Sequence, residues 1–327
     1  MIANEKIETM EKTDLAKLQL ERLRKQVKWV YEKSAYYQKL FDQVGIKPND
    51  IVTLADIEKI PCMEKKVLQE VSVYDILTLP LSGVLRISRQ GYSHAYVKMY
   101  TSGDVARQME MMTRVLVGYD INDTTVVGIL GEASDSRMMD VQYALEGIGC
   151  CVMLMGSNMD NIVELMTQCH VDVLVSDFRL LTQLIVKLQA DGEEAEDLYI
   201  PSIICLEETL HNPMRVYIER RLNVNTKTVY NSTSFGCAGM MYQCKVGKGY
   251  HVNEDYFYPE ILELGSDKVI SESHRVGELV ISALTAEAMP ILRLRTGHLV
   301  MRLDGECPCG RTLIRVAPPT EYEGDFS

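Results

Sequence analysis

The sequence Thr-Val-Val-Gly-Ile-Leu at residues 125–130 is the first of five short apolar runs that are separated by helical patterns. The other runs occupy residues 150–155, 171–176, 202–206 and 227–231, and the helical patterns lie near 136–148, 159–169, 178–190 and 212–222. Short apolar strands that alternate with helices are typical of a parallel sheet covered by helices on both faces. The sequence therefore predicts an α/β fold for this part of the chain.

The segment before this core is expected to be mainly helical. Leu20, Leu23 and Val27 recur at helical spacing and form one apolar face, which predicts a long helix. Thr13 and Asp14 are suited to cap its beginning. We expect Gly45, together with Pro48, to end this helix.

Two further patterns complete the expected organisation. Residues 84–100 alternate apolar and polar side chains and predict a half-buried strand pair, and a helical pattern follows at 105–117. The sequence after Tyr250 is richer in strand and turn patterns. We therefore expect one large domain made of a helical segment at 1–76, an α/β nucleotide-pocket part at 77–249 and a β-rich part at 250–327.

Composition and charge exclude several classes of protein. The chain has 327 residues, 46% of them apolar, which is enough for a large core. The net charge of −12 argues against nucleic-acid binding through a basic face. No run of 18 uncharged apolar residues occurs, and the first twelve residues do not resemble a signal peptide. Nine cysteines without regular spacing favour a cytoplasmic chain with free thiols.

Five motifs follow one another in the last third of the sequence. They are Tyr-Asn-Ser-Thr-Ser at 230–234, Gly-Tyr-His-Val-Asn at 249–253, Gly-Glu-Leu-Val at 277–280, Met-Pro-Ile-Leu-Arg-Leu-Arg-Thr-Gly-His-Leu at 289–299 and Gly-Glu-Cys-Pro-Cys-Gly-Arg at 305–311. Their order and spacing resemble the phenylacetate–CoA ligase family of AMP-forming, adenylate-forming ligases. The resemblance implies mostly parallel sheets flanked by helices, with a β-rich C-terminal part.

The resemblance also implies an activity. Such enzymes join an aryl or acyl carboxylate to AMP at the expense of ATP and then transfer the acyl group to coenzyme A. In this family a lid of about a hundred residues, the size of a small domain, follows the last motif. This sequence ends at Ser327, so the resemblance covers the large N-terminal domain and we expect the lid to be absent.

The resemblance places a phosphate loop at the start of the helix near 105–117. The family pattern Ser/Thr-Ser-Gly-Thr-Thr-Gly-Lys-Pro aligns here with Thr101, Ser102, Gly103 and, three residues beyond Asp104, Arg107. Backbone N–H groups of such turns bind phosphate. Asp104 introduces a carboxylate, and two like charges about 4 Å apart repel by roughly 1–4 kcal/mol. The alternative is that Asp104 caps the helix that follows.

The resemblance assigns further nucleotide contacts to the ends of two predicted strands. Glu207 stands where the family has a Gly-Gly-Glu turn, although both glycines are replaced. Tyr230 matches the tyrosine that stacks on adenine. The residues after it in the same motif are Asn231, Ser232 and Thr233.

Two positions depart from the family at groups that carry chemistry. Ser234 replaces the glutamate that holds magnesium, and a hydroxyl is a poor substitute because Mg²⁺ prefers carboxylate and phosphate oxygens. His298 replaces the aspartate that accepts hydrogen bonds from both ribose hydroxyls, whereas a neutral imidazole accepts only one. Arg295 is retained and could face a phosphate, with ion pairing to surface acids as the alternative. These changes predict that the chain is weak or inactive as a ligase.

Four residues suggest a metal site. Cys244 and His251 lie on a predicted hairpin, and Cys307 and Cys309 lie in the tight turn Cys-Pro-Cys-Gly. Three thiolates and one imidazole suit a tetrahedral structural zinc. Some members of the family look similar here and hold a structural zinc. The alternative is that the four residues are unrelated.

Three functions are compatible with these patterns. The first is an ATP-dependent ligase that acts on an aryl or acyl carboxylate with magnesium and coenzyme A. The second is a binding module that retains a small-molecule or nucleotide pocket without chemistry. The third is an interaction subunit, either a homodimer or a partner of an active homologue.

Overall fold

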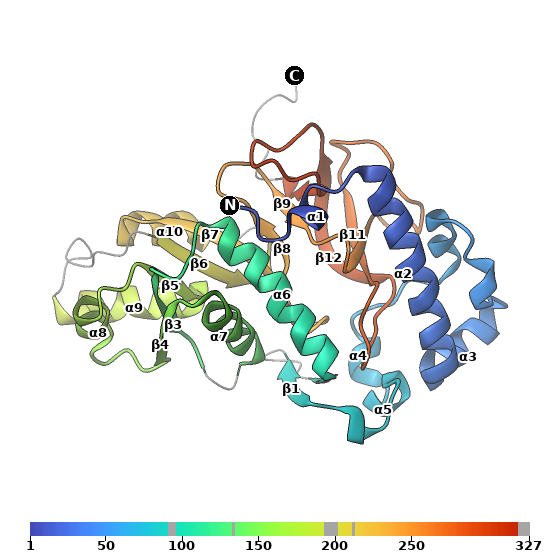
Figure 1. The fold of residues 1–327 in the computed structure, drawn as a ribbon, viewed down its shortest axis with the longest axis horizontal. Helices are drawn as coiled ribbons and strands as arrows, with labels where there is room; N and C mark the ends of the chain where they lie inside the picture. The colour runs from blue at the N-terminus through green and yellow to red at the C-terminus, as the bar shows by residue number, and fades with distance from the viewer. Residues whose placement is uncertain (91–95, 133–134, 193–201, 211–212, 320–327) are drawn as a thin grey trace. The chain divides into compact units, whose positions relative to one another are not determined.

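The computed structural model describes residues 1–90, 96–132, 135–192, 202–210 and 213–319 (Figure 1). These residues form two compact units. The first unit comprises Met1–Ala3, Gln108–Ser232 and Gly236–Lys248, and the second comprises Asn4–Arg107, Thr233–Phe235 and the chain from Gly249 onward.

The first unit is built on a mostly parallel sheet. Its strands are β3 (Val126–Leu130), β4 (Cys151–Gly156), β5 (Val173–Ser176), β6 (Ser202–Glu207), β7 (Asn225–Ser232) and β8 (Cys237–Gln243). Their order in the sheet is β8-β7-β6-β5-β3-β4. The pairs from β4 to β7 are parallel, and β8 runs antiparallel to β7. All four residues of β5 are buried, as expected for a central strand of a sheet covered on both faces.

Helices cover both faces of this sheet (Figure 1). They are α7 (Ser136–Ile148), α8 (Ile162–Gln168), α9 (Phe178–Asp191), α10 (Met214–Leu222) and the part of α6 (Ser102–Gly118) from Gln108 onward. One apolar core packs side chains of α6 and α7 against the sheet. A separate core packs α8, α9 and α10 against it. The alternation read from the sequence therefore forms the expected three layers.

The second unit begins with helices. They are α1 (Glu5–Glu8), α2 (Lys12–Lys33), α3 (Ala35–Val44), α4 (Val67–Glu70) and α5 (Val73–Ile76), with short 3₁₀ turns at Pro48–Asp50, Leu54–Lys59 and Leu81–Gly83. A two-stranded hairpin of β1 (Arg86–Gln90) and β2 (Tyr96–Tyr100) follows, and then the first turn of α6.

The rest of the second unit is antiparallel. Its strands are β9 (Tyr250–Val252), β10 (Phe257–Leu262), β11 (Gly277–Ala283), β12 (Leu294–Leu303) and β13 (Arg315–Ala317), in the order β10-β11-β12-β13-β9. Each neighbouring pair is antiparallel. The prediction of an α/β fold with a β-rich C-terminal part is confirmed.

The N-terminal helix differs from the prediction in two places. Helix α2 starts at Lys12, and no side chain caps it, so the capping role expected for Thr13 and Asp14 is wrong. The helix also ends at Lys33, because Ser34 takes an extended backbone conformation and caps α3 by accepting a hydrogen bond from Tyr37 N. The predicted stop at Gly45, which has a φ of 73°, ends α3 instead. Among the described residues, no helix is long and apolar enough to cross a membrane.

Candidate nucleotide and metal sites

The predicted phosphate loop lies at the start of α6 in the second unit, where Thr101 and Asp104 bind each other. The Asp104 carboxylate accepts a hydrogen bond from Thr101 N at 3.0 Å, and the Thr101 hydroxyl accepts one from Asp104 N at 3.0 Å. This reciprocal arrangement is a capping box, which satisfies two helix N–H groups at once. Asp104 therefore caps the helix, which was the alternative expected from the sequence.

Asp104 also holds a distant loop, residues 284–293 between β11 and β12. Its two carboxylate oxygens accept hydrogen bonds from Glu287 N at 2.8 Å and from Ala288 N at 3.0 Å. Arg107, one helical turn further on, donates to it at 2.9 Å. The carboxylate thus receives three backbone N–H groups and one guanidinium. Such donors stabilise its negative charge and use its accepting capacity.

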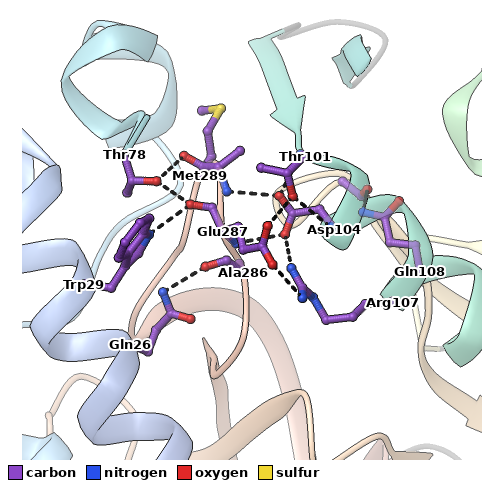
Figure 2. Close-up of polar contacts among 12 residues, drawn as sticks. Gln26, Trp29, Thr78, Thr101, Asp104, Arg107, Gln108, Ala286, Glu287 and Met289 are labelled. Carbon is purple, nitrogen blue, oxygen red and sulfur yellow. Dashed lines mark hydrogen bonds and ion pairs between the residues drawn. The ribbon is translucent and has the colours of Figure 1, made fainter. Parts of the chain in front are cut away.

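The Glu287 side chain lies over the same turn (Figure 2). The Thr101 hydroxyl donates to one of its carboxylate oxygens at 2.6 Å, and Arg107 forms an ion pair with it at 2.9 Å. A β-carbon added to Gly103 would lie 2.5 Å from Glu287 Oε1. The absence of a side chain at Gly103 therefore lets this carboxylate approach the backbone of the loop. Two of the residues predicted to face phosphate, Thr101 and Arg107, face this carboxylate instead.

The guanidinium of Arg295 also forms ion pairs with acidic side chains. It pairs with Glu278 and Asp267, and Glu64 lies 3.6 Å away. These contacts correspond to the alternative in which Arg295 pairs with nearby carboxylates. His298, two residues before Val300 on β12, is partly exposed, and its backbone N–H donates to the Thr296 hydroxyl at 3.2 Å.

The segment 233–235 also belongs to the second unit. The Thr233 carbonyl accepts a hydrogen bond from the Tyr96 hydroxyl. Ser234 is 7% exposed and offers one hydroxyl where the resemblance places the magnesium carboxylate. The side chains at this position therefore do not fit a magnesium ion well, because the hard cation prefers anionic oxygen ligands.

Four predicted nucleotide residues lie in the first unit, at the carboxyl ends of β6 and β7. Glu207 accepts a hydrogen bond from Phe178 N at 2.7 Å and so satisfies the N-terminus of α9. Tyr230 is 3% exposed, and burial raises the pKa of its hydroxyl. Asn231, oriented with its amide oxygen toward Arg137, accepts from that guanidinium at 2.8 Å and 3.1 Å. Ser232 lies in the same strand as Tyr230 and Asn231 and is also buried.

His251, Cys307 and Cys309 come together in the second unit. Their ligand atoms all lie within 4.8 Å of one another, and Cys309 Sγ is 3.4 Å from His251 Nε2. Burial alone would lower the pKa of His251, but its hydrogen bonds to both thiols outweigh that effect and raise it. Burial likewise opposes ionisation of Cys307, while the hydrogen bond from His251 lowers the pKa of its thiol. The contact with His251 therefore favours the thiolate form of Cys307, which is the form that binds metals.

This geometry fits zinc. A tetrahedral ion with bonds of about 2.3 Å to sulfur and about 2.0 Å to nitrogen separates those two atoms by about 3.5 Å. The separation between Cys309 Sγ and His251 Nε2 is 3.4 Å. His251 Nδ1 also lies 3.2 Å from the Leu313 carbonyl, which accepts its proton and leaves Nε2 free to coordinate. Cys244 follows β8 in the first unit, so its role as the fourth ligand stays a prediction.

An interaction that the sequence did not suggest supports the cysteine turn. Glu8 is fully buried and forms an ion pair with Arg311, which is 4% exposed. The Glu8 carbonyl also accepts a hydrogen bond from Thr312 N at 3.0 Å. Helix α1 is thereby attached to the segment that follows Cys309. No local sequence pattern indicates this pair, because Glu8 and Arg311 are about three hundred positions apart.

Comparisons with known proteins identify relatives of the chain. No protein-family model matches the chain. It is 26% identical over 323 residues to the phenylacetate-coenzyme A ligase of Thermus thermophilus, covering 97% of this chain and 72% of the relative. It is 28% identical over 327 residues to the enzyme of that name from Escherichia coli, covering 97% and 74%. The chain is a homologue of the phenylacetate-coenzyme A ligases.

Solved structures support the fold of this homologue. A 2-hydroxyisobutyryl-CoA ligase in complex with 2-HIB-AMP and CoA superposes with a TM-score of 0.86 at 16% identity, covering 95% of this chain and 75% of that one. A benzoate CoA ligase from Burkholderia xenovorans gives a TM-score of 0.51 at 14% identity, covering 72% and 49%. The fold of the phenylacetate-CoA ligase homologue is therefore that of adenylate-forming CoA ligases.

Glu287 is the site residue of this homologue that sequence reasoning missed. The one signal available was an acid between two alanines, Ala286-Glu287-Ala288, in an otherwise apolar stretch. Its partners Thr101 and Arg107 lie about 180 positions earlier, so no local pattern connects them.

Proposed function

We propose that this chain is an adenylate-forming protein of the phenylacetate-CoA ligase type whose own adenylation step is slow. The observation that carries the proposal is homology to these ligases over 97% of the chain, together with a Thr-Ser-Gly turn at the start of α6. In the proposed reaction a carboxylate oxygen attacks the α-phosphorus of ATP, and pyrophosphate leaves. The thiol of coenzyme A then attacks the acyl carbon, and AMP leaves. The substrate class is an aryl or acyl carboxylate.

The proposed roles of the residues rest on the sequence resemblance to these ligases. Thr101, Ser102 and Gly103 would present hydroxyl and N–H groups to phosphate, and Tyr230 would stack on adenine. The low rate is supported by three side chains. Asp104 adds a negative charge at the loop, Ser234 supplies no carboxylate for magnesium, and His298 offers one hydrogen-bond acceptor to the ribose instead of two.

The first prediction concerns adenylation itself. Each lost contact costs about 1.4 kcal/mol or more, which is about tenfold in rate, so three altered positions predict an exchange about a thousandfold slower. ATP–pyrophosphate exchange with phenylacetate should be measured on this protein and on the Escherichia coli relative in parallel. Exchange within tenfold of the relative would contradict the proposal of a slow enzyme.

The second prediction reverses two of these changes. The double variant Ser234→Glu, His298→Asp should bind ATP with magnesium at least about tenfold more tightly than the natural chain. The glutamate at 234 would supply a carboxylate ligand for magnesium, and the aspartate at 298 could accept hydrogen bonds from both ribose hydroxyls. Isothermal titration calorimetry measures the affinity. The matched control Ser234→Gln, His298→Asn has similar volume without the charges and should gain little. An equal gain in both variants would show that charge at these positions is not the cause.

A second function is supported by the carboxylates that pair with the two arginines matching the basic residues of the family motifs. Arg107 and Arg295 are both paired with carboxylates, which supports a non-catalytic nucleotide-binding or interaction subunit that kept the ligase fold. Calorimetry with AMP and with coenzyme A, and co-purification with an active homologue, separate this function from slow catalysis. Binding of AMP without any pyrophosphate exchange would favour it. A homodimer is the other assembly that we propose.

We also propose a structural zinc and a cytoplasmic location. The zinc would be held by His251, Cys307 and Cys309 with Cys244 as the fourth ligand, and a site filled by four protein ligands is structural. All nine cysteines are free thiols, which supports a reducing compartment.

A further inference from the structure

The Glu287 carboxylate occupies the place above the loop at 101–104 where an anion would bind. It accepts a hydrogen bond from the Thr101 hydroxyl at 2.6 Å and pairs with Arg107 at 2.9 Å. It also lies directly over Gly103, since a β-carbon there would be 2.5 Å from Glu287 Oε1. A hydroxyl, a guanidinium and a bare backbone at a helix start are the groups that bind phosphate in proteins. Here all three groups lie against the carboxylate of Glu287.

The backbone of Glu287 is fixed in this position by many partners (Figure 2). Its N–H donates to Asp104 at 2.8 Å, and its carbonyl accepts from Trp29 Nε1 at 3.1 Å and from the Thr78 hydroxyl. The carbonyl of the preceding Ala286 accepts from Gln26 at 2.9 Å. The loop position is therefore set by α2, by α6 and by the segment that follows α5. Only the Glu287 side chain, which is 44% exposed, can leave without disturbing them.

The charges of the cluster show why an external anion would compete with Glu287. Asp104 receives three backbone N–H groups and one guanidinium bond, so its charge is already stabilised within the fold. Arg107 is the cation of this cluster, and it is shared between Asp104 and Glu287. A phosphate that entered beside Glu287 would meet a second carboxylate only a few ångströms away, where like charges repel.

We infer that Glu287 is an internal anion that keeps the loop closed to phosphate and that removing its carboxylate opens a phosphate-binding site on Thr101, Gly103 and Arg107. The ligand class is a phosphate or pyrophosphate group, free or as part of a nucleotide. This inference deepens the proposed function and rests on it for the choice of ligand. Its central claim, that Glu287 excludes the anion, concerns binding alone and requires no chemistry.

Calorimetric titration with inorganic pyrophosphate tests the inference on the full chain. Glu287→Ala should bind pyrophosphate at least about tenfold more tightly than the natural protein, because one carboxylate near the anion is removed. Glu287→Gln keeps the volume of the side chain and removes only its charge, so it should gain affinity in the same direction. Both variants keep the backbone N–H and carbonyl of residue 287 and should melt near the natural temperature.

Two further variants locate the effect. Arg107→Ala in the Glu287→Ala background should abolish the gain, because the guanidinium is the cation of the cluster. Glu21→Ala removes the same charge from an exposed glutamate on α2 that pairs with Lys25 at 2.6 Å, and it should leave pyrophosphate affinity unchanged. A gain that survives Arg107→Ala, or an equal gain in Glu21→Ala, would overturn the inference.

The result separates the inference from the proposed function. Equal pyrophosphate affinity in the natural protein and in both Glu287 variants would overturn the inference, whatever the rate of exchange with phenylacetate. Tighter pyrophosphate binding in the Glu287 variants without any exchange would support the inference and leave the adenylation proposal to fail alone.

Discussion

Replacement of Cys307 by serine should abolish zinc binding at the proposed site and lower the melting temperature by about 10 °C. The ligand atoms of His251, Cys307 and Cys309 converge within 4.8 Å, and these residues come from β9 and from a turn more than fifty positions later. A metal that binds only the folded chain stabilises it by about 4 kcal/mol when free zinc exceeds the dissociation constant a thousandfold. For the second unit, which holds these three residues, that energy corresponds to about 10 °C. Elemental analysis of protein purified without a metal-affinity tag measures the zinc, and calorimetry measures the melting.

Cys169→Ser is the matched control for this prediction. Cys169 is an exposed free thiol at the end of α8, so its loss should change neither the zinc content nor the melting temperature. A strong chelator should lower the melting temperature of the natural protein and of Cys169→Ser, but not that of Cys307→Ser. One equivalent of zinc that persists in Cys307→Ser would show that the metal is held elsewhere.

The fold of the first unit could be predicted from the sequence because its signals are local. The apolar run predicted at 125–130 forms β3 at Val126–Leu130, and the helical pattern at 136–148 forms α7 at Ser136–Ile148. A strand buried on both faces needs a continuous apolar run, and a covering helix needs an apolar stripe. Both requirements can be read without knowing which elements meet in space.

The break between α2 and α3 could not be predicted in the same way. Helical spacing continues through Ser34, and no proline or glycine interrupts it. The helix ends there because the Ser34 hydroxyl donates to the Asp75 carbonyl at 2.8 Å and caps α3. Asp75 is forty-one positions away, so this tertiary contact decides the boundary and leaves no local trace.

The phosphate loop shows the same division between local and distant contacts. The bond between Thr101 and Asp104 spans three residues, and the capping alternative could therefore be recognised from the sequence. The second partner of the loop, Glu287, lies on the connection between β11 and β12. Its carboxylate reaches Thr101 and Arg107 only because the chain folds, so the sequence could indicate an altered loop but not the group that fills it.

Arg293 forms a buried ion pair, and its loss should have a large effect on the stability of the protein. This residue is 1% exposed and pairs with the buried Glu260 at 2.9 Å and 3.1 Å. The remaining guanidinium nitrogen donates to the carbonyls of Glu58 and Ile60 at 3.1 Å and 2.7 Å. The pair therefore connects strand β10 to the segment that follows α3. Each nitrogen of the Arg293 guanidinium donates to at least one acceptor, as a buried charge requires.

Glu260→Ala should destabilise the protein by about 3–5 kcal/mol, because it leaves the Arg293 charge buried without a counter-charge. The melting temperature should fall by about 10 °C, measured by calorimetry on the natural protein and the variant. The double variant Glu260→Met, Arg293→Met should recover part of the loss, since a buried ion pair can be replaced by apolar side chains of similar volume. Recovery should be incomplete because the carbonyls of Glu58 and Ile60 lose their donor.

The control for this prediction is a glutamate that forms an ion pair on the protein surface. Glu21 and Lys25 pair at 2.6 Å on the surface of α2, with side chains that are 61% and 74% exposed. Glu21→Ala should leave the melting temperature almost unchanged, because solvent screens the exposed pair and each ion remains hydrated when its partner is lost. If Glu260→Ala melted at the same temperature as Glu21→Ala, the Arg293 charge would have to reach water in the variant, and the argument from burial would fail. A large loss in Glu260→Ala alone would show that burial, and not the number of ion pairs, determines what this contact contributes.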